Sequence, residues 1–351
     1  MENIKEKNIV SFPPTSGSNP YYSLFYGALK SNGINKVDNN KPLSSEWITK
    51  ESDDIDIVHF HWLVNYYDNP SLKRTIINAL TFIQKLFLIK KSGKQLFFTC
   101  HNLFPHSSRN RLIDWVVRVF ILHLSDTVIV HSNVAQKKIK KYFLKRKNVC
   151  VIPHGNYIGA YQNVVPKDQA RDNFNLDKKD KVFLFFGSLQ EYKGITDLIT
   201  AFKALNSDNA KLIIAGKASD RSYGETLEAL CKDDSSILLE NRLLDDHELQ
   251  VYFNAADVAV LPFKKILTSG SLLLAYSFGC PVLIPDLPAL REYSNPEVAF
   301  YINENLTSAL EHTISTLEST NVNFEEQVQE YIKHFNWKEV VKPVIQFIKE
   351  N

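Results

Sequence analysis

Short apolar runs alternate with longer amphipathic segments along this whole chain, and this alternation limits the possible folds more than any other feature. The apolar runs cover residues 8–12, 54–62, 95–102, 126–132 and 149–155, and then 181–189, 210–216, 235–241, 257–263 and 281–285. Segments of helical periodicity separate them, as at 20–32, 71–91, 108–124 and 133–144. Strands that alternate with helices predict parallel sheets joined by right-handed crossovers, so we expect an α/β fold.

Two domains are expected, because 351 residues exceed what one ordinary core holds. The strand–helix series restarts near residue 181, after a Pro- and Asp-containing stretch at 156–180. We therefore predict two doubly wound, Rossmann-like domains that face each other across a cleft. In such domains ligands bind beyond the carboxyl ends of the strands.

Several classes of protein are disfavoured by composition. No apolar run approaches the ~20 residues that cross a bilayer, and the polar start "MENIKEKNIVSF" has no signal-peptide core. The four cysteines, at 100, 150, 231 and 280, form no CxxC pair, so we interpret them as buried thiols of a reducing compartment. We expect a cytoplasmic protein.

Charge is distributed unevenly between the two halves. Residues 1–165 carry 22 basic and 11 acidic side chains, whereas residues 166–351 carry 19 and 28. The basic residues concentrate in two stretches of roughly helical apolar spacing, 71–94 and 136–148. These are either solvated helix faces or a contact with an anionic membrane surface. Nucleic acid is a third possibility, but no nucleic-acid-binding motif accompanies the charge.

Two elements of the second half suit a phosphate group. The strand at 181–186 ends in Gly187 and Ser188, and Lys193 follows just before a helix. The turn Thr268, Ser269, Gly270, Ser271 opens another helix, whose N-terminal N–H groups and dipole favour an anion. Either element alone is weak, because an N-cap or a solvated lysine explains it. Together they predict a diphosphate site.

The order of motifs then resembles that of the GT-B glycosyltransferases, close to their group 1 (GT4-like) branch. The second half contains "FGSLQEYKG", "LIIAG", "LLENRLLDDHELQVYFNAADVAVLPF" and "TSGSLLLAYSFGCPVLIPD", and the first contains "NPYYSLFYGALKSNGI", "DIVHFHWL", "FTCHNLFPHS", "VIVHSNVAQKKI" and "VIPHGNY". The resemblance implies an acceptor domain at 1–160, a nucleotide-sugar domain at 161–325, and C-terminal helices at 326–351 that return to the first domain. It also implies base recognition within 240–249 and around Gly216.

Two departures from the family pattern bear on the mechanism. Ser188 stands where the family often has arginine, and Ile266 and Leu274 stand where many retaining members have paired glutamates. The chain thus resembles an atypical subset that lacks these glutamates. We expect an inverting reaction, with a retaining one as the alternative. The absent glutamates also leave open a non-catalytic partner subunit with the same fold.

Histidines gather at the predicted strand ends of the first half. Inversion requires a base, and a side chain with a pKa near 7 suits that task. We favour His106 or His61 as the base, keep His101 as a third catalytic candidate, and expect Asn102 and His154 to orient hydroxyls. Ser16, Gly17 and Asn19 are predicted to line the cleft. Metal ligation by "HFH" and "HNLFPH" is the rival explanation, but the family stabilises its leaving group without a metal.

The sequence thus predicts a glycosyltransferase that uses a nucleotide sugar, GDP-mannose or a UDP-sugar, and needs no metal or other cofactor. The expected acceptor is a saccharide on a lipid pyrophosphate, as in bacterial surface polysaccharide synthesis. The expected location is the inner face of the cell membrane.

Overall fold

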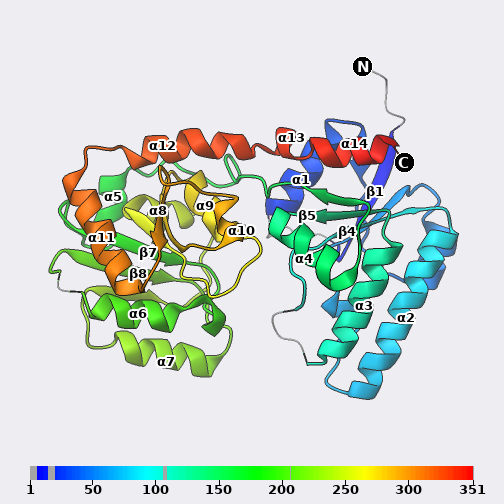
Figure 1. The fold of residues 1–351 in the computed structure, drawn as a ribbon, viewed down its shortest axis with the longest axis horizontal. Coiled ribbons are helices and arrows are strands. Elements are labelled where there is room, and N and C mark those ends of the chain that lie inside the picture. Colours follow the sequence, from blue (N-terminus) through cyan, green and yellow to red (C-terminus); the bar gives the residue numbers. More distant parts are fainter. Residues whose placement is uncertain (1–5, 15–19, 106–108, 206, 351) are drawn as a thin grey trace. The chain divides into compact units, whose positions relative to one another are not determined.

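A computed structural model describes residues 6–14, 20–105, 109–205 and 207–350 (Figure 1). The chain forms two compact units. The first, called the N-unit, comprises Met1–Gly155 and Trp337–Asn351, and the second, called the C-unit, comprises Asn156–Asn336. The expected boundaries at 160 and 326 therefore fall at 155 and 336 instead.

The N-unit contains a six-stranded parallel sheet in the order β2-β1-β3-β4-β5-β6. Its strands are β1 (Lys7–Phe12), β2 (Ile34–Lys36), β3 (Ile57–Phe60), β4 (Gln95–Thr99), β5 (Thr127–Val130) and β6 (Val149–Val151). Its longer helices are α1 (Pro20–Lys30), α2 (Leu72–Lys91), α3 (Arg111–Leu124) and α4 (Asn133–Phe143), and α13 (Trp337–Val340) and α14 (Lys342–Glu350) end the chain. Sequence reasoning missed β2, a three-residue edge strand.

The C-unit contains a second six-stranded parallel sheet, in the order β12-β11-β10-β7-β8-β9. Its strands are β7 (Lys181–Phe186), β8 (Ala210–Ala215), β9 (Ile237–Glu240), β10 (Val258–Val260), β11 (Val282–Pro285) and β12 (Ala299–Ile302). Its helices are α5 (Lys167–Asp172), α6 (Ile195–Lys203), α7 (Arg221–Cys231), α8 (Leu249–Ala255), α9 (Gly270–Ser277), α10 (Pro288–Arg291), α11 (Leu306–Ser319) and α12 (Phe324–Tyr331). The edge strand β12 was not predicted.

Burial explains why these strands are continuous apolar runs. The sheet of the C-unit has one apolar cluster that includes Leu184 and Leu273 and another that includes Phe185 and Leu198. A parallel strand covered on both faces needs apolar side chains on both, so it does not alternate with polar residues. Within the described residues, no helix is both long and apolar enough to cross a membrane.

The C-terminal helices divide between the two cores. Val328 and Phe335 pack in the C-unit, whereas Trp337, Val341 and Ile348 pack against the sheet of the N-unit. Only the part from Trp337 therefore joins the N-unit, and the expectation that the returning segment begins at 326 is corrected by this burial.

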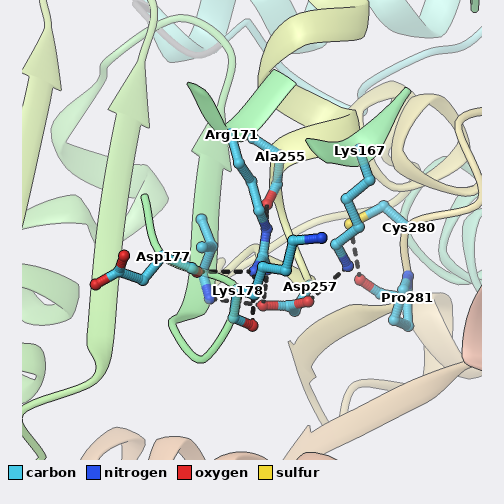
Figure 2. Close-up of polar contacts among 9 residues, drawn as sticks. Lys167, Arg171, Asp177, Lys178, Ala255, Asp257, Cys280 and Pro281 are labelled. Atoms are coloured by element: carbon cyan, nitrogen blue, oxygen red, sulfur yellow. Dashed lines mark hydrogen bonds and ion pairs between the residues drawn. The ribbon is translucent and has the colours of Figure 1, made fainter. Parts of the chain in front are cut away.

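A polar network fixes α5 and the loop after it to the start of the C-unit sheet (Figure 2). Asp257, which precedes β10, accepts hydrogen bonds from Lys167 Nζ (2.7 Å), Arg171 Nη2 (2.7 Å) and the Val182 amide (2.8 Å). Arg171 is buried and also donates to the carbonyls of Ala255, Asp177 and Lys178. Asp257 and its two ion pairs thus join three segments that are far apart in the sequence.

We predict that Asp257→Asn destabilises the protein by roughly 3 kcal/mol, because it leaves the buried Arg171 guanidinium without its anionic partner. Asp168→Asn is the matched control, since Asp168 pairs with Lys178 in water and its loss is expected to change the stability little. The measurement is the urea midpoint of each variant. Equal decreases of the urea midpoint in the two variants would contradict a stabilising role of the network.

Candidate functional site

The switch point of the C-unit sheet lies between the neighbouring strands β7 and β10. From β7 the chain continues to β8 and β9 on one side, whereas from β10 it continues to β11 and β12 on the other. Ligands of doubly wound sheets bind in the crevice at this position. The loops that leave β7 and β10 are the ones that carry the two predicted phosphate elements.

Glycines allow these loops to approach closely. At Gly194 (φ +77°) a Cβ atom would lie 2.5 Å from the Pro262 carbonyl oxygen, and at Gly216 (φ +149°) one would lie 2.0 Å from the Gly187 carbonyl oxygen. Any side chain at these positions would therefore force the strand exits apart. The exits of β7, β8 and β10 form one continuous backbone edge.

Lys193, Ser188 and Ser271 meet at this edge. Lys193 Nζ donates to Ser188 Oγ (2.9 Å), and a Cβ atom on Gly187 would lie 3.3 Å from both Lys193 Nζ and Ser271 Oγ. Burial lowers the pKa of the Lys193 ammonium to about 8. The cluster therefore holds a desolvated cation and two hydroxyls at a point where glycine leaves space.

The remaining residues of the "TSGS" turn start helix α9. Ser269 is its N-cap and accepts from the Leu272 amide (3.1 Å), and the Tyr157 hydroxyl lies 3.2 Å from the Cβ position of Gly270. Thr268 is partly exposed beside them. The structure thus brings the "TSGS" turn and the loop from Gly187 to Lys193 together at Ser271, and their role in donor binding stays a prediction. Leu274 is buried in the core, and Ile266 packs against it, so neither can replace a glutamate.

The segment expected to recognise the base lies after β9 and contains a cluster of ion pairs. Arg242 donates to Glu240 (2.8 Å) and through two nitrogens to Glu248 (2.9 and 2.6 Å). Hydrogen bonds from Arg242 lower the pKa of Glu248 to about 2. These contacts fix the loop, and base recognition by it stays a prediction.

In the N-unit, the strand-end histidines form connected hydrogen bonds. His59 Nε2 shares a hydrogen bond with Thr99 Oγ1 (2.8 Å), and His59 Nδ1 with Tyr26 Oη (2.8 Å). Tyr26 Oη also bonds His61 Nε2 (2.9 Å), and His61 Nδ1 bonds His101 Nε2 (3.1 Å). The hydrogen bonds thus link five residues, which are called the histidine chain below, in the order Thr99, His59, Tyr26, His61 and His101.

Two further histidines lie beside the histidine chain. His131 Nδ1 donates to the Ile152 carbonyl (3.2 Å), and Tyr21 Oη bonds its Nε2 (3.3 Å). His154 Nδ1 donates to the Gly155 carbonyl (2.7 Å), and its ring lies against Trp337. Both donate to a carbonyl, so both carry their hydrogen on Nδ1.

All these imidazoles are neutral. Burial lowers the pKa of His59 to about 3, and burial with the neighbouring His154, His59 and Arg118 lowers that of His101 to about 3. The pKa of His154 falls to about 4, and those of His61 and His131 fall well below the usual value, again chiefly through burial. The expectation of a pKa near 7 does not hold in this environment, because the charged form loses its water.

The predicted catalytic residues differ in their exposure and in whether a ring nitrogen is available to a substrate. His61 is buried, and both its ring nitrogens already bond within the histidine chain, so it cannot accept a proton directly from a substrate. His101 and Asn102 are partly exposed. His106, Ser16, Gly17 and Asn19 lie outside the described residues.

Sequence reasoning missed Tyr26 and Thr99. Tyr26 reads as an ordinary core residue of an amphipathic helix, and Thr99 as the end of an apolar strand. The only signal was indirect: buried histidines need polar partners. Among the described residues no three His, Cys, Asp or Glu side chains are arranged to hold a metal ion, and metal-independent chemistry stays a prediction.

Comparison with known proteins gives two family matches. Residues 35–156 match the model described as Glycosyltransferase Family 4, and residues 166–335 match Glycosyl transferases group 1. The chain is 25% identical over 311 residues to a GDP-mannose:glycolipid 4-beta-D-mannosyltransferase of Xanthomonas campestris pv. campestris. The aligned region covers 85% of this chain and 79% of that protein.

Solved structures confirm the fold class. HepE of Anabaena, in complex with UDP-glucose, superposes with a TM-score of 0.75 at 13% identity and covers 98% of this chain and 100% of that one. Sucrose-phosphate synthase of Thermosynechococcus elongatus gives a TM-score of 0.73 at 18% identity and covers 98% and 99%. The predicted α/β GT-B fold with two doubly wound domains is therefore confirmed.

We predict that acid destabilises the N-unit. The pKa values of His59 and His101 are about 3 when folded and 6.5 in the reference state, so the unfolded chain binds more protons between these limits. Stability therefore falls as the pH falls through this window, by roughly 2 kcal/mol per residue at pH 5.

All four tryptophans (Trp47, Trp62, Trp115 and Trp337) lie in the N-unit, so tryptophan fluorescence reports its urea midpoint alone. The exposed histidines of the C-unit do not contribute to this signal. A midpoint that is the same at pH 7 and pH 5 would show that the histidines are not held neutral by burial.

Proposed function

Because this chain belongs to the group 1 (GT4-like) glycosyltransferases, we propose that it transfers a sugar from a nucleotide diphosphate to a lipid-linked saccharide with inversion. The transferase activity itself follows from the family. The donor, the acceptor and the stereochemistry are the proposal. The observation that carries it is the meeting of Lys193, Ser188 and Ser271 at the switch point of the C-unit.

The diphosphate of the donor binds at this cluster. Its oxygens accept from Lys193, from the two serine hydroxyls and from N–H groups at the start of α9. Charge develops on the leaving diphosphate as the sugar departs, and a preorganised cation and donors stabilise that charge. GDP-mannose is the first choice for the donor, because a relative at 25% identity is named for it, and a UDP-sugar is the second.

Inversion is supported by the side chains that replace the glutamates. Leu274 and Ile266 are apolar, so neither can assist at the face of the sugar from which the nucleotide leaves. The same relative is named for a β-mannosyl product, which is what inversion gives from an α-linked donor. A retaining reaction is the alternative, and the anomeric configuration of the product decides between them.

His101 is the proposed base. The acceptor O–H bond breaks, and its proton moves to Nδ1 of His101 while the oxygen bonds the anomeric carbon. The bond between that carbon and the phosphate oxygen breaks, and its electron pair leaves with the diphosphate. His101 has the position for this role because it is partly exposed and its other nitrogen is already held by His61.

The lipid part of the acceptor suggests a membrane surface, and helices α2 and α3 offer one. They pack side by side in the N-unit (Figure 1). Their exposed side chains include many large apolar ones: Leu72, Ile76, Ile77, Leu80 and Phe87 on α2, and Leu112 and Trp115 on α3. Exposed Lys73, Arg74 and Arg111 lie among them. Apolar and basic residues together fit an anionic bilayer surface.

A non-catalytic partner subunit is disfavoured by the donor site. Lys193 is partly buried next to Gly194, where no side chain fits, and burial lowers its pKa; a scaffold has no use for such a partly desolvated cation.

We predict that GDP or UDP binds the wild-type protein and that Lys193→Ala weakens this binding at least about tenfold, since a charge-assisted contact is lost. Because the Lys193 pKa is about 8, its charge is lost as the pH rises, and wild-type affinity falls about tenfold from pH 7 to 9. Isothermal titration calorimetry with each nucleotide measures both effects.

Lys203→Ala is the control, because this exposed lysine lies at the far end of α6 and keeps normal binding. If Lys193→Ala binds as well as the wild type, the cluster is not the diphosphate site. If the wild type binds neither nucleotide at millimolar concentration, the partner-subunit alternative replaces the proposal.

We also predict that Ile76→Ser combined with Leu80→Ser lowers the partition onto anionic vesicles by about tenfold or more, because two apolar side chains no longer insert. The matched control is Val164→Ser combined with Leu243→Ser, which removes two apolar side chains of the C-unit that are even more exposed. Co-sedimentation with anionic and with neutral vesicles measures the partition. Equal binding by both double variants would refute docking through α2 and α3.

A further inference from the structure

The bonds of the histidine chain limit where each imidazole can carry its hydrogen. Burial keeps each imidazole neutral, so each has one N–H donor and one acceptor nitrogen. Burial also raises the pKa of Tyr26, so its hydroxyl keeps its single hydrogen. Tyr26 bonds two histidine nitrogens, and its single hydrogen can go to only one of them or to the Ser11 side chain, which it also bonds.

When Tyr26 donates to a histidine, all hydrogens of the histidine chain run in one of two directions. In the first, His101 Nε2–H donates to His61, His61 Nε2–H donates to Tyr26, Tyr26 donates to His59, and His59 Nε2–H donates to Thr99. In the second, every donor and acceptor is exchanged. The first direction leaves a lone pair on His101 Nδ1, and the second places a hydrogen there.

We propose that Tyr26 and Thr99 are positioning residues that hold the histidine chain in the first direction and so make His101 Nδ1 a base. The inference rests on the proposed role of His101, since only a nitrogen with a lone pair can accept the hydroxyl proton. His101 is also the one partly exposed member of the chain, the other four being buried. The reactive nitrogen thus lies at the end that a substrate can reach.

The far end of the chain permits the first direction. The Thr99 hydroxyl, which is fully buried, can accept from His59 Nε2–H. Without that oxygen, an N–H at His59 Nε2 would be left unsatisfied in an apolar environment, at a substantial cost. His59 then carries its hydrogen on Nδ1, and each bond up to His101 reverses.

Imidazole nitrogen NMR of the protein labelled with ¹⁵N-histidine tests this directly, because protonated and unprotonated ring nitrogens have different shifts. The wild type is expected to show His101 protonated on Nε2. Thr99→Val is expected to move that hydrogen to Nδ1, although along the hydrogen bonds three side chains separate Thr99 from His101. Tyr26→Phe is expected to uncouple the two ends, so that His101 shows both tautomers.

The structure offers two controls. Tyr22 lies on the same helix with its ring parallel to that of Tyr26, and its buried hydroxyl has no hydrogen-bond partner among the described residues. Tyr22→Phe therefore removes the same atom without touching the chain and leaves the His101 tautomer unchanged. Thr99→Ser keeps the hydroxyl and is expected to restore the wild-type spectrum if Thr99→Val unfolds or shifts the protein.

Two results overturn the proposal: a wild-type His101 protonated on Nδ1, or a His101 tautomer unaffected by both Thr99→Val and Tyr26→Phe. The spectra are recorded without substrate, so they test the His101 tautomer independently of the proposed transfer reaction. His101→Gln tests that function separately, since it abolishes transfer if His101 is the base. Normal transfer by His101→Gln with the expected spectra would remove the base assignment and leave the coupling intact.

Discussion

The parallel arrangement of both sheets is the constraint from which the rest of this enzyme follows. It brings the carboxyl ends of six strands to one edge in each unit, where ligands of such sheets usually bind. In the C-unit the edge can close only because Gly194 and Gly216 have no side chain to separate neighbouring strand exits. This close approach brings Lys193 to Ser188 and Ser271, and it excludes enough water to lower the pKa of the Lys193 ammonium.

The same topology is used differently in the N-unit. Its strand ends carry neutral imidazoles instead of a cation, and their polar nitrogens are satisfied by one another and by Tyr26 and Thr99. A buried polar group without a partner costs more than a hydrogen bond gains, so such a network must be complete to be stable. One unit thus places a lysine at its strand ends, which we propose stabilises a leaving anion, and the other places neutral imidazoles there.

Much of the fold could be predicted because the parallel strands are apolar on both faces and the helices are amphipathic. The short edge strands β2 and β12 were missed, since three or four residues give no period to detect. The proximity of the two proposed phosphate elements was predicted from local motifs at one helix start and one strand exit; their binding of a donor stays a prediction. The histidine chain could not be predicted, because Tyr26 reaches His59 and His61 from more than thirty residues away. Spacing along the sequence contains no trace of such a contact.

The low pKa of His101 and its proposed role as a base need to be reconciled. In the enzyme without substrate, the His101 imidazole has a pKa of about 3 and is a weak base, but it keeps its lone pair at every working pH. Its pKa is depressed by burial and by nearby groups, and these effects depend on the charge of the surroundings. An anionic substrate that binds beside His101 adds a favourable interaction with the imidazolium and raises that pKa. The base would then gain strength when the substrate arrives, which limits unproductive protonation in the empty enzyme.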